Sequence, residues 1–150
     1  MAESAILGGS PIAKDVVVPA WPMSDETERG AVLDVLTSGS WYNGDRVKEF
    51  EDSFAAMQDA KYGVATTGGT VALEAIVRAA GLGVGDEIIT SSYTFIGTCT
   101  AILKTGVAIR FVDIDPDTNN LDINQIEDAV TSHTRAIMPV HYGGLACDID

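Results

Sequence analysis

Residues 62–112, YGVATTGGTVALEAIVRAAGLGVGDEIITSSYTFIGTCTAILKTGVAIRFV, decide the fold class, because short apolar runs alternate there with longer helical segments. The expected strands are 62–66, 87–90 and 108–112, and the expected helices are 68–80 and 94–104. Strands that alternate with helices predict an α/β fold with a mainly parallel sheet and helical crossovers. Apolar strands such as 108–112 also suit a sheet that is covered on both faces.

Further elements are expected before residue 62 and after residue 112. We also expect an N-terminal arm at 1–24 and a strand at 135–140. Further helices are expected at 24–38, at 122–130 and in a segment that begins at Asp45. Glycine and proline interrupt the arm. Acidic residues at the start of the first helix suit its dipole, Gly39 is expected to end it, and Asp45 is expected to cap the second helix.

The composition is that of a globular protein, since 46% of the 150 residues are apolar and 21% are charged. The formal net charge of −13 argues against nucleic acid as a partner, because an acidic chain repels phosphate backbones. No apolar run is long enough to cross a membrane, and the first residues lack the pattern of a secretory signal. We expect a soluble cytoplasmic protein in which Cys99 and Cys147 are reduced.

The first candidate site is the glycine-rich junction between the strand at 62–66 and the helix that follows it. Gly68, Gly69 and Thr70 stand where the helix begins, and the first N–H groups of a helix have no partner within it. With the helix dipole these groups can hold an anion, and the Thr70 hydroxyl adds a donor. A phosphate monoester fits this position. The alternative is a turn softened by glycine, with Thr70 as a helix cap.

Two further candidates follow the next strands. Phe95 can stack on a flat heterocycle, or it can be core packing for its own helix. His141 can bond an oxygen of a cofactor or substrate, or it can be a satisfied structural residue. Because ligands of open parallel sheets gather at the carboxyl ends of the strands, we expect all the candidates at one edge.

Other motifs fail the requirements of the sites they resemble. The glycines of 81–85 follow a helix and precede a strand, which is the wrong order for a dinucleotide fingerprint. The acidic segment 113–117 lacks the turn glycine and the closing glutamate of a calcium loop. The histidines and Cys147 lack zinc spacing, so we expect no metal.

Taken in order, segments from about Val18 to Asp150 resemble the DegT/DnrJ/StrS family of pyridoxal-phosphate-dependent sugar aminotransferases. No single segment is decisive, but the ordered set is specific. The segments are 19–22, 38–44, 50–51, 69–70 with 72–73, 83–87, 94–95, 111–116 and 137–141. The opening segment is also similar to the amino-hydroxybenzoate synthase branch.

The resemblance implies the aspartate-aminotransferase type of fold, with residues 25–150 as an incomplete large domain that binds pyridoxal 5'-phosphate (PLP). It implies a homodimer with active sites at the subunit interface, and transfer of an amino group from glutamate to a keto-sugar nucleotide. Gly69 and Thr70, with Gly68 beside them, would bind the cofactor phosphate. Phe95 would stack on the pyridine ring, and His141 is the candidate substrate-binding residue.

The sequence departs from the family in two respects. Gly68 stands where the family has serine or asparagine, so one cofactor contact would be absent or made by the backbone. The resemblance places the Schiff-base lysine, and the aspartate that pairs with the pyridine nitrogen, beyond Asp150. The four lysines of the chain do not lie in the family's lysine context. We therefore expect no catalytic residue within residues 1–150, and no turnover by these residues alone.

Three other functions stay open. A PLP-dependent sugar dehydratase of the same family has histidine in place of the Schiff-base lysine. A regulatory protein of the same fold would bind PLP or a sugar nucleotide without catalysis. A doubly wound nucleotide-binding module is the third, although the fingerprint after its first strand is missing.

Overall fold

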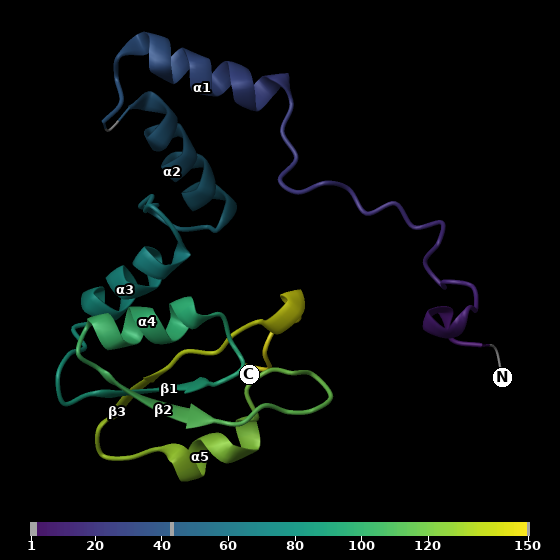
Figure 1. Cartoon of the computed structure of the whole chain (residues 1–150). Coiled ribbons are helices and arrows are strands. Elements are labelled where there is room, and N and C mark those ends of the chain that lie inside the picture. The colour runs from purple at the N-terminus through teal and green to yellow at the C-terminus, as the bar shows by residue number, and fades with distance from the viewer. Residues whose placement is uncertain (1–2, 43, 150) are drawn as a thin grey trace. The chain divides into compact units, whose positions relative to one another are not determined.

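The computed structural model describes residues 3–42 and 44–149. The chain divides into two units, Met1–Lys61 and Tyr62–Asp150 (Figure 1). None of the helices in the described residues has the length and apolar character that a membrane span requires.

The first unit contains a 3-10 turn, η1 (Ala5–Leu7), and the helices α1 (Glu26–Ser38) and α2 (Asp45–Met57). Helix α1 starts with a capping box, in which Asp25 accepts from the Thr27 amide and Glu28 accepts from the Asp25 amide. Gly39, with a φ of 68°, ends α1 as predicted. The predicted cap at Asp45 is wrong: Gly44 precedes α2, and Asp45 is its first residue, where its charge still suits the helix dipole.

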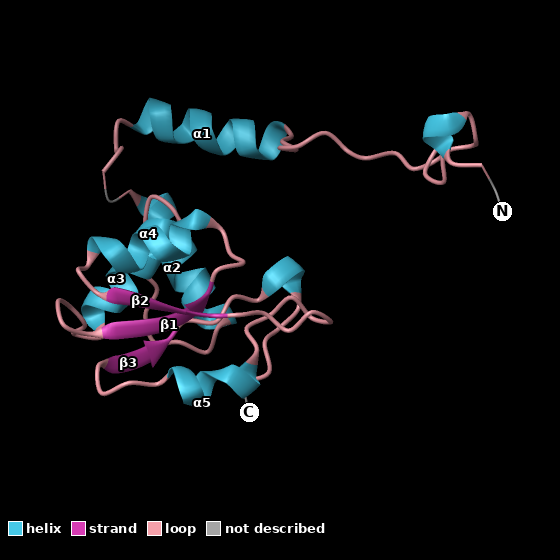
Figure 2. Ribbon diagram, turned by 60° about the horizontal axis from the view of Figure 1, so that its bottom comes forward, coloured by secondary structure: helices cyan, strands magenta, loops and turns pink. Residues whose placement is uncertain are grey.

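The second unit is an α/β layer built on a parallel sheet, as predicted. Its elements are α3 (Gly69–Ala79), β1 (Glu87–Ser91), α4 (Ile96–Lys104), β2 (Ala108–Val112), η2 (Ile123–Gln125), α5 (Ile126–Ala129), β3 (Thr134–Ile137) and η3 (Tyr142–Gly144). The strands lie in the order β2-β1-β3, and β1 pairs in parallel with both neighbours. All three arrows therefore point the same way (Figure 2).

Two core clusters lie on opposite faces of the central strand β1. Ile88 packs with side chains of α3 and α4, whereas Ile89 packs with side chains of β2 and α5. Successive side chains of a strand point to opposite faces, so this pair faces both layers. Figure 1 shows α3 and α4 on one side of the sheet and α5 on the other. The expectation of a sheet covered on both faces is confirmed.

Two predicted strands differ from the structure. Residues 62–66 join no ladder of the described sheet, in which both edges of β1 are already occupied by β2 and β3. The strand expected at 135–140 is β3, which ends at Ile137. The Met138 amide still bonds to the Ile89 carbonyl, and Pro139, which has no N–H, cannot continue the ladder.

The carboxyl ends of the parallel strands define one edge of the sheet. The loop after β1 leads into α4 at this edge, and the loop after β3 forms η3 there (Figures 1 and 2). The Thr90 hydroxyl, which is fully buried, donates to the Met138 carbonyl at 2.8 Å and ties the ends of β1 and β3 together. Phe95 and His141 lie in the loops that follow β1 and β3 at this edge.

Candidate functional site

The start of α3 has the features of an anion site. Gly68 precedes the helix, and its carbonyl accepts from the amides of Val71 and Ala72, each at 3.1 Å. The amides of Gly69 and Thr70 come before these first bonds and so face out of the helix end. No side chain caps α3 in the described part of the chain, and Thr70 is its second residue rather than its cap.

The space in front of this helix end is open. A Cβ built on Gly68 or on Gly69 would meet no atom within 4 Å. The Thr66 hydroxyl donates to the Gly68 carbonyl at 3.0 Å and fixes the turn that leads into the helix. A small anion can therefore approach the first amides of α3, where the helix dipole favours negative charge.

Gly97 brings the Thr70 hydroxyl and the Phe95 ring together. A Cβ built on Gly97 would lie 2.6 Å from Thr70 Oγ1 and 2.8 Å from Phe95 Cδ1. Gly97 is the second residue of α4 and is buried, so the starts of α3 and α4 meet at a position where only hydrogen fits. The structure thus joins a phosphate-binding candidate and a ring-stacking candidate that are distant in sequence.

The Phe95 side chain does not pack in the core of the described residues. Its side chain is 76% exposed, although it stands immediately before the first residue of α4. A hydrogen bond of 2.9 Å between the hydroxyls of Thr94 and Thr98 holds the chain at this turn. An exposed aromatic ring at a fixed helix start presents a flat apolar surface on which a heterocycle can stack.

His141 lies in the loop after β3, at the same sheet edge, and its bonds fix its tautomer. Its Nδ1 accepts from the Cys147 amide at 3.0 Å, so the neutral ring carries its proton on Nε2. The Cys147 thiol bonds to the Val140 carbonyl at 3.1 Å and closes this loop on itself. The His141 side chain is exposed, and it can donate a hydrogen bond from Nε2.

Sequence reasoning missed three residues at this edge: Asn120, Tyr93 and Tyr142. The rings of Tyr93 and Tyr142 stack with centroids 4.2 Å apart and planes 25° from parallel. A hydrogen bond with Tyr93 raises the pKa of the Tyr142 hydroxyl above its ordinary value, and desolvation adds to the shift. Tyr93 was visible in the loop after β1, but no pattern in the sequence indicates its partner.

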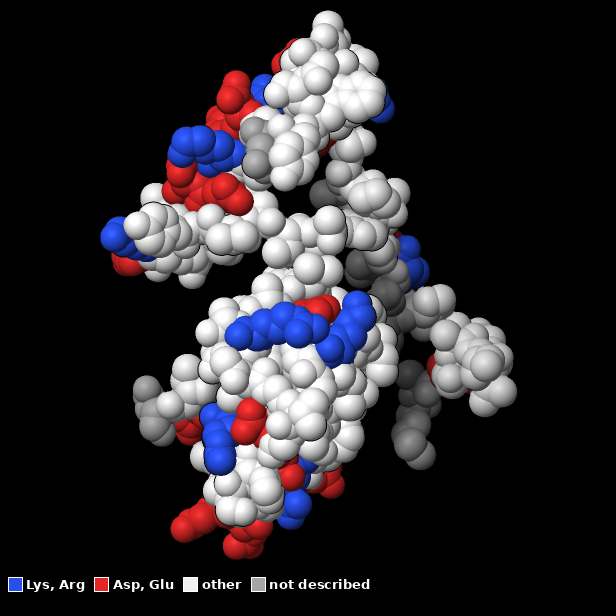
Figure 3. Space-filling model, turned by 90° about the vertical axis from the view of Figure 1, so that its left-hand side faces the viewer, with Lys and Arg blue, Asp and Glu red and all other residues white. Residues whose placement is uncertain are grey.

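Lys104 and Lys48 each form an ion pair within their own unit. Lys104 is the last residue of α4, and its Nζ pairs with Glu74 of α3 at 3.7 Å. Lys48 pairs with Asp52 within α2. On the face of the molecule in Figure 3, basic and acidic groups likewise lie next to one another. Lys104 thus lies at the opposite end of α4 from Phe95.

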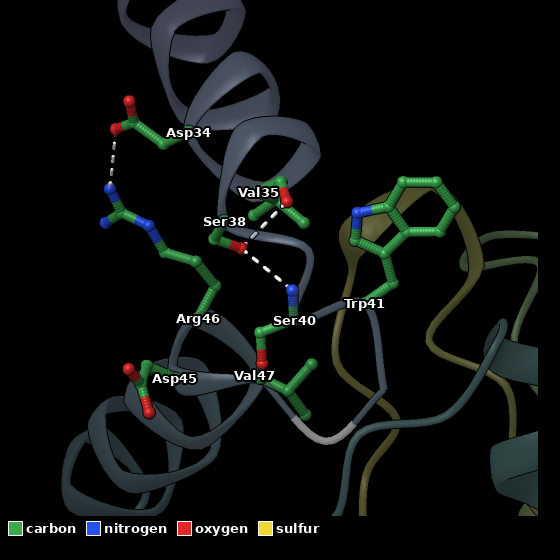
Figure 4. A pocket seen from close by; sticks show the side chains of 9 residues that line it. Asp34, Val35, Ser38, Ser40, Trp41, Asp45, Arg46 and Val47 are labelled. Atoms are coloured by element: carbon green, nitrogen blue, oxygen red, sulfur yellow. Dashed lines mark hydrogen bonds and ion pairs between the residues drawn. The ribbon is translucent and has the colours of Figure 1, made fainter.

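A hollow of about 250 Å³ lies in the first unit where α1 ends and α2 begins (Figure 4). Arg46 pairs there with Asp34 at 3.5 Å, and the Ser38 hydroxyl donates to the Val35 carbonyl and accepts from the Ser40 amide. These polar groups bond to one another across the turn. None of the predicted site residues lines the hollow. It is part of the junction between α1 and α2.

The contact around Gly97 can be tested by adding one methyl group. Alanine normally stabilises a helix relative to glycine by about 0.5–1 kcal/mol. At Gly97 the added Cβ overlaps Thr70 and Phe95, and overpacking costs about 1–3 kcal/mol. We expect Gly97→Ala to lower the free energy of unfolding, measured by urea denaturation. Gly83→Ala is the control, because a Cβ there meets nothing within 4 Å. A Gly97→Ala protein that is more stable than the parent would contradict this geometry.

Comparison with known proteins gives a consistent result. The model of the DegT/DnrJ/EryC1/StrS aminotransferase family matches residues 22–150. The 3-amino-5-hydroxybenzoate synthase of Amycolatopsis mediterranei is 42% identical over 88% of the chain and 34% of its own length. The UDP-4-amino-4-deoxy-L-arabinose–oxoglutarate aminotransferase of Shewanella sediminis is 36% identical over 86% of the chain and 33% of its own length.

A solved structure agrees with these sequences. The PLP form of the sugar aminotransferase Spr1654 from Streptococcus pneumoniae superposes with a TM-score of 0.83 at 33% identity, covering 88% of the chain and 34% of Spr1654. The chain thus spans about a third of the length of the relatives it matches.

Proposed function

This chain belongs to the DegT/DnrJ/EryC1/StrS aminotransferase family, and we propose that the complete protein transfers an amino group from glutamate to a keto-sugar nucleotide. The observation that carries the proposal is the convergence of Thr70 Oγ1 and the Phe95 ring on Gly97, beside the open start of α3. One relative is named for a UDP-linked amino sugar and oxoglutarate, the keto acid that glutamate becomes when it donates its amino group.

The cofactor of this family is PLP, as the PLP form of the Spr1654 structure illustrates. The residues present fit it, because a phosphate suits the open start of α3 and a planar ring suits the exposed face of Phe95. When bound, PLP supplies a carbonyl carbon that takes up amino groups and a ring that accepts electrons.

We assign each candidate residue of the chain a role in holding the ligands. The amides of Gly69 and Thr70, with the Thr70 hydroxyl, bind the phosphate without a lysine. Gly68 leaves room for the phosphate and contributes no side chain. Phe95 stacks on the ring and sets its plane, and His141 donates from Nε2 to an oxygen of the substrate.

From the family resemblance we also propose the domains, the assembly and the location of the catalytic lysine. Residues 25–150 are part of the PLP-binding large domain, and residues 1–24 are an arm. The complete protein is a cytoplasmic homodimer whose active sites lie at the subunit interface. The lysine that bonds the cofactor lies outside residues 1–150.

An assay of the complete protein tests the reaction. The protein is saturated with PLP and incubated with glutamate and a UDP-linked 3-oxo or 4-oxo sugar. We expect 2-oxoglutarate and the amino sugar to form in equal amounts, and neither product to form when glutamate is omitted. Loss of water from the sugar without 2-oxoglutarate would favour the dehydratase. Binding of PLP or of the sugar nucleotide without turnover would favour the regulatory alternative.

A further inference from the structure

Asn120 locks the loop after β3 from a buried position. Its side chain is only 5% exposed and makes three hydrogen bonds to backbone groups of that loop. Its Oδ1 accepts from the Tyr142 amide at 3.0 Å, and its Nδ2 donates to the carbonyls of Leu145 at 3.2 Å and Ala146 at 3.1 Å. Buried hydrogen bonds of this kind restrict a loop to one conformation. The backbone of Tyr142 is therefore held in place.

The ring of Tyr142 carries this constraint to the loop after β1. It stacks on Tyr93 with ring centroids 4.2 Å apart and planes 25° from parallel. The Tyr93 carbonyl accepts from the Ser91 hydroxyl at 3.2 Å, so its backbone is tied to the end of β1. Tyr93 is 44% exposed, which places the pair at the rim of the sheet edge rather than in the core.

Tyr93 in turn fixes the chain that enters α4. Phe95 follows it by only two residues, and the hydroxyl bond between Thr94 and Thr98 leaves little freedom between them. The Phe95 ring then rests against Gly97. Contacts therefore join Asn120 to Tyr142 and Tyr142 to Tyr93, and the short segment 93–95 leads from the tyrosine pair to Phe95.

We propose that the tyrosine pair, Tyr93 with Tyr142, is a positioning device that holds Phe95 in the plane required by the cofactor ring. This inference rests on the proposed function, since it assigns Phe95 to the PLP ring. In this proposal both tyrosines act through Phe95. The pair links two strand-end loops, so its loss lets the entrance of α4 shift while both core clusters stay intact.

Removal of one ring in the complete protein tests the proposal. We expect Tyr142→Ala to weaken PLP binding by about two- to tenfold, the range that an aromatic pair contributes, and to move the absorption maximum of bound PLP. Tyr142→Phe keeps the stacked ring, so its affinity should stay within about twofold of the parent. Tyr93→Leu removes the other ring of the stacked pair, which is partly exposed. We expect it to weaken PLP binding and to move the absorption maximum as much as Tyr142→Ala does. Tyr42→Ala is the control, because Tyr42 is an exposed aromatic residue of the first unit.

The possible outcomes separate this inference from the proposed function. If the parent protein binds PLP and both stack-removing variants keep its affinity and spectrum, the positioning role is wrong and the proposed function stands. If Tyr142→Phe loses as much affinity as Tyr142→Ala, the hydroxyl acts instead of the stack, and the inference also fails. If the parent itself does not bind PLP, the proposed function and the inference fall together.

Discussion

Residues 1–150 alone are expected to catalyse no transamination. The reaction proposed for the complete protein needs a lysine that would hold the cofactor and carry a proton to and from the substrate carbon, and we place this lysine outside residues 1–150. Within the described residues, Lys104 at the end of α4 pairs with Glu74 in the middle of α3, and Lys48 pairs with Asp52. The Lys104 amine is thus held by an ion pair with a side chain of α3 that lies beyond the first turn, and the first turn is where the phosphate is expected.

The measurement is formation of 2-oxoglutarate from glutamate in the presence of PLP and a keto-sugar nucleotide. Positioned proton transfer alone contributes about 10²–10⁴-fold to a rate, so its loss leaves only the reaction of free PLP. A solution of PLP without protein sets that background, and the complete protein is the positive control. Turnover by residues 1–150 above the background would refute the assignment of the lysine to another part of the protein.

Thr70→Val should weaken PLP binding by about tenfold or more. Valine keeps the shape of threonine but lacks the hydroxyl, and a hydrogen bond to a charged group contributes about 1.5–3 kcal/mol. A difference of about 1.4 kcal/mol corresponds to a factor of ten in the dissociation constant. The Thr70 side chain also touches the space at Gly97, which valine fills equally well, so the packing of Phe95 should persist.

The test compares PLP with pyridoxal, which lacks the phosphate, in absorbance titrations of the complete protein. We expect Thr70→Val to lower the affinity for PLP about tenfold and to leave the affinity for pyridoxal unchanged, because in the proposal only the phosphate bonds to Thr70. Thr37→Val is the matched control, since the Thr37 hydroxyl bonds to the Leu33 carbonyl in α1. Equal losses for both ligands would mean that Thr70 acts on the ring or on the fold, and the phosphate assignment would be wrong.

Features that depend on local pattern were predictable from the sequence. Apolar runs such as that of β2 gave the parallel sheet, and the glycine-rich junction at Gly68 and Gly69 marked the start of α3. Residues 62–66 show the limit of such reasoning, because they have the composition of a strand but form no ladder of the described sheet. The predicted cap at Asp45 failed because the helix begins one residue earlier than a cap would allow.

Features that depend on contacts between distant side chains were not predictable. The role of Gly97 follows from the approach of α3 to α4, and no local signal separates it from an ordinary helix glycine. The stacking of Tyr93 on Tyr142 depends on the register of β1 and β3 and on the three bonds of Asn120. Tertiary packing specifies such residues, so only the structure shows that they support the candidate site.

Borohydride reduction of the native protein, followed by peptide mapping, shows which lysine holds the cofactor. Reduction makes the bond between a lysine and the cofactor permanent, so mass spectrometry can locate it. The account predicts one pyridoxyl group per chain, on a lysine outside residues 1–150. A group on Lys14, Lys48, Lys61 or Lys104, or a native protein that carries none, would contradict it.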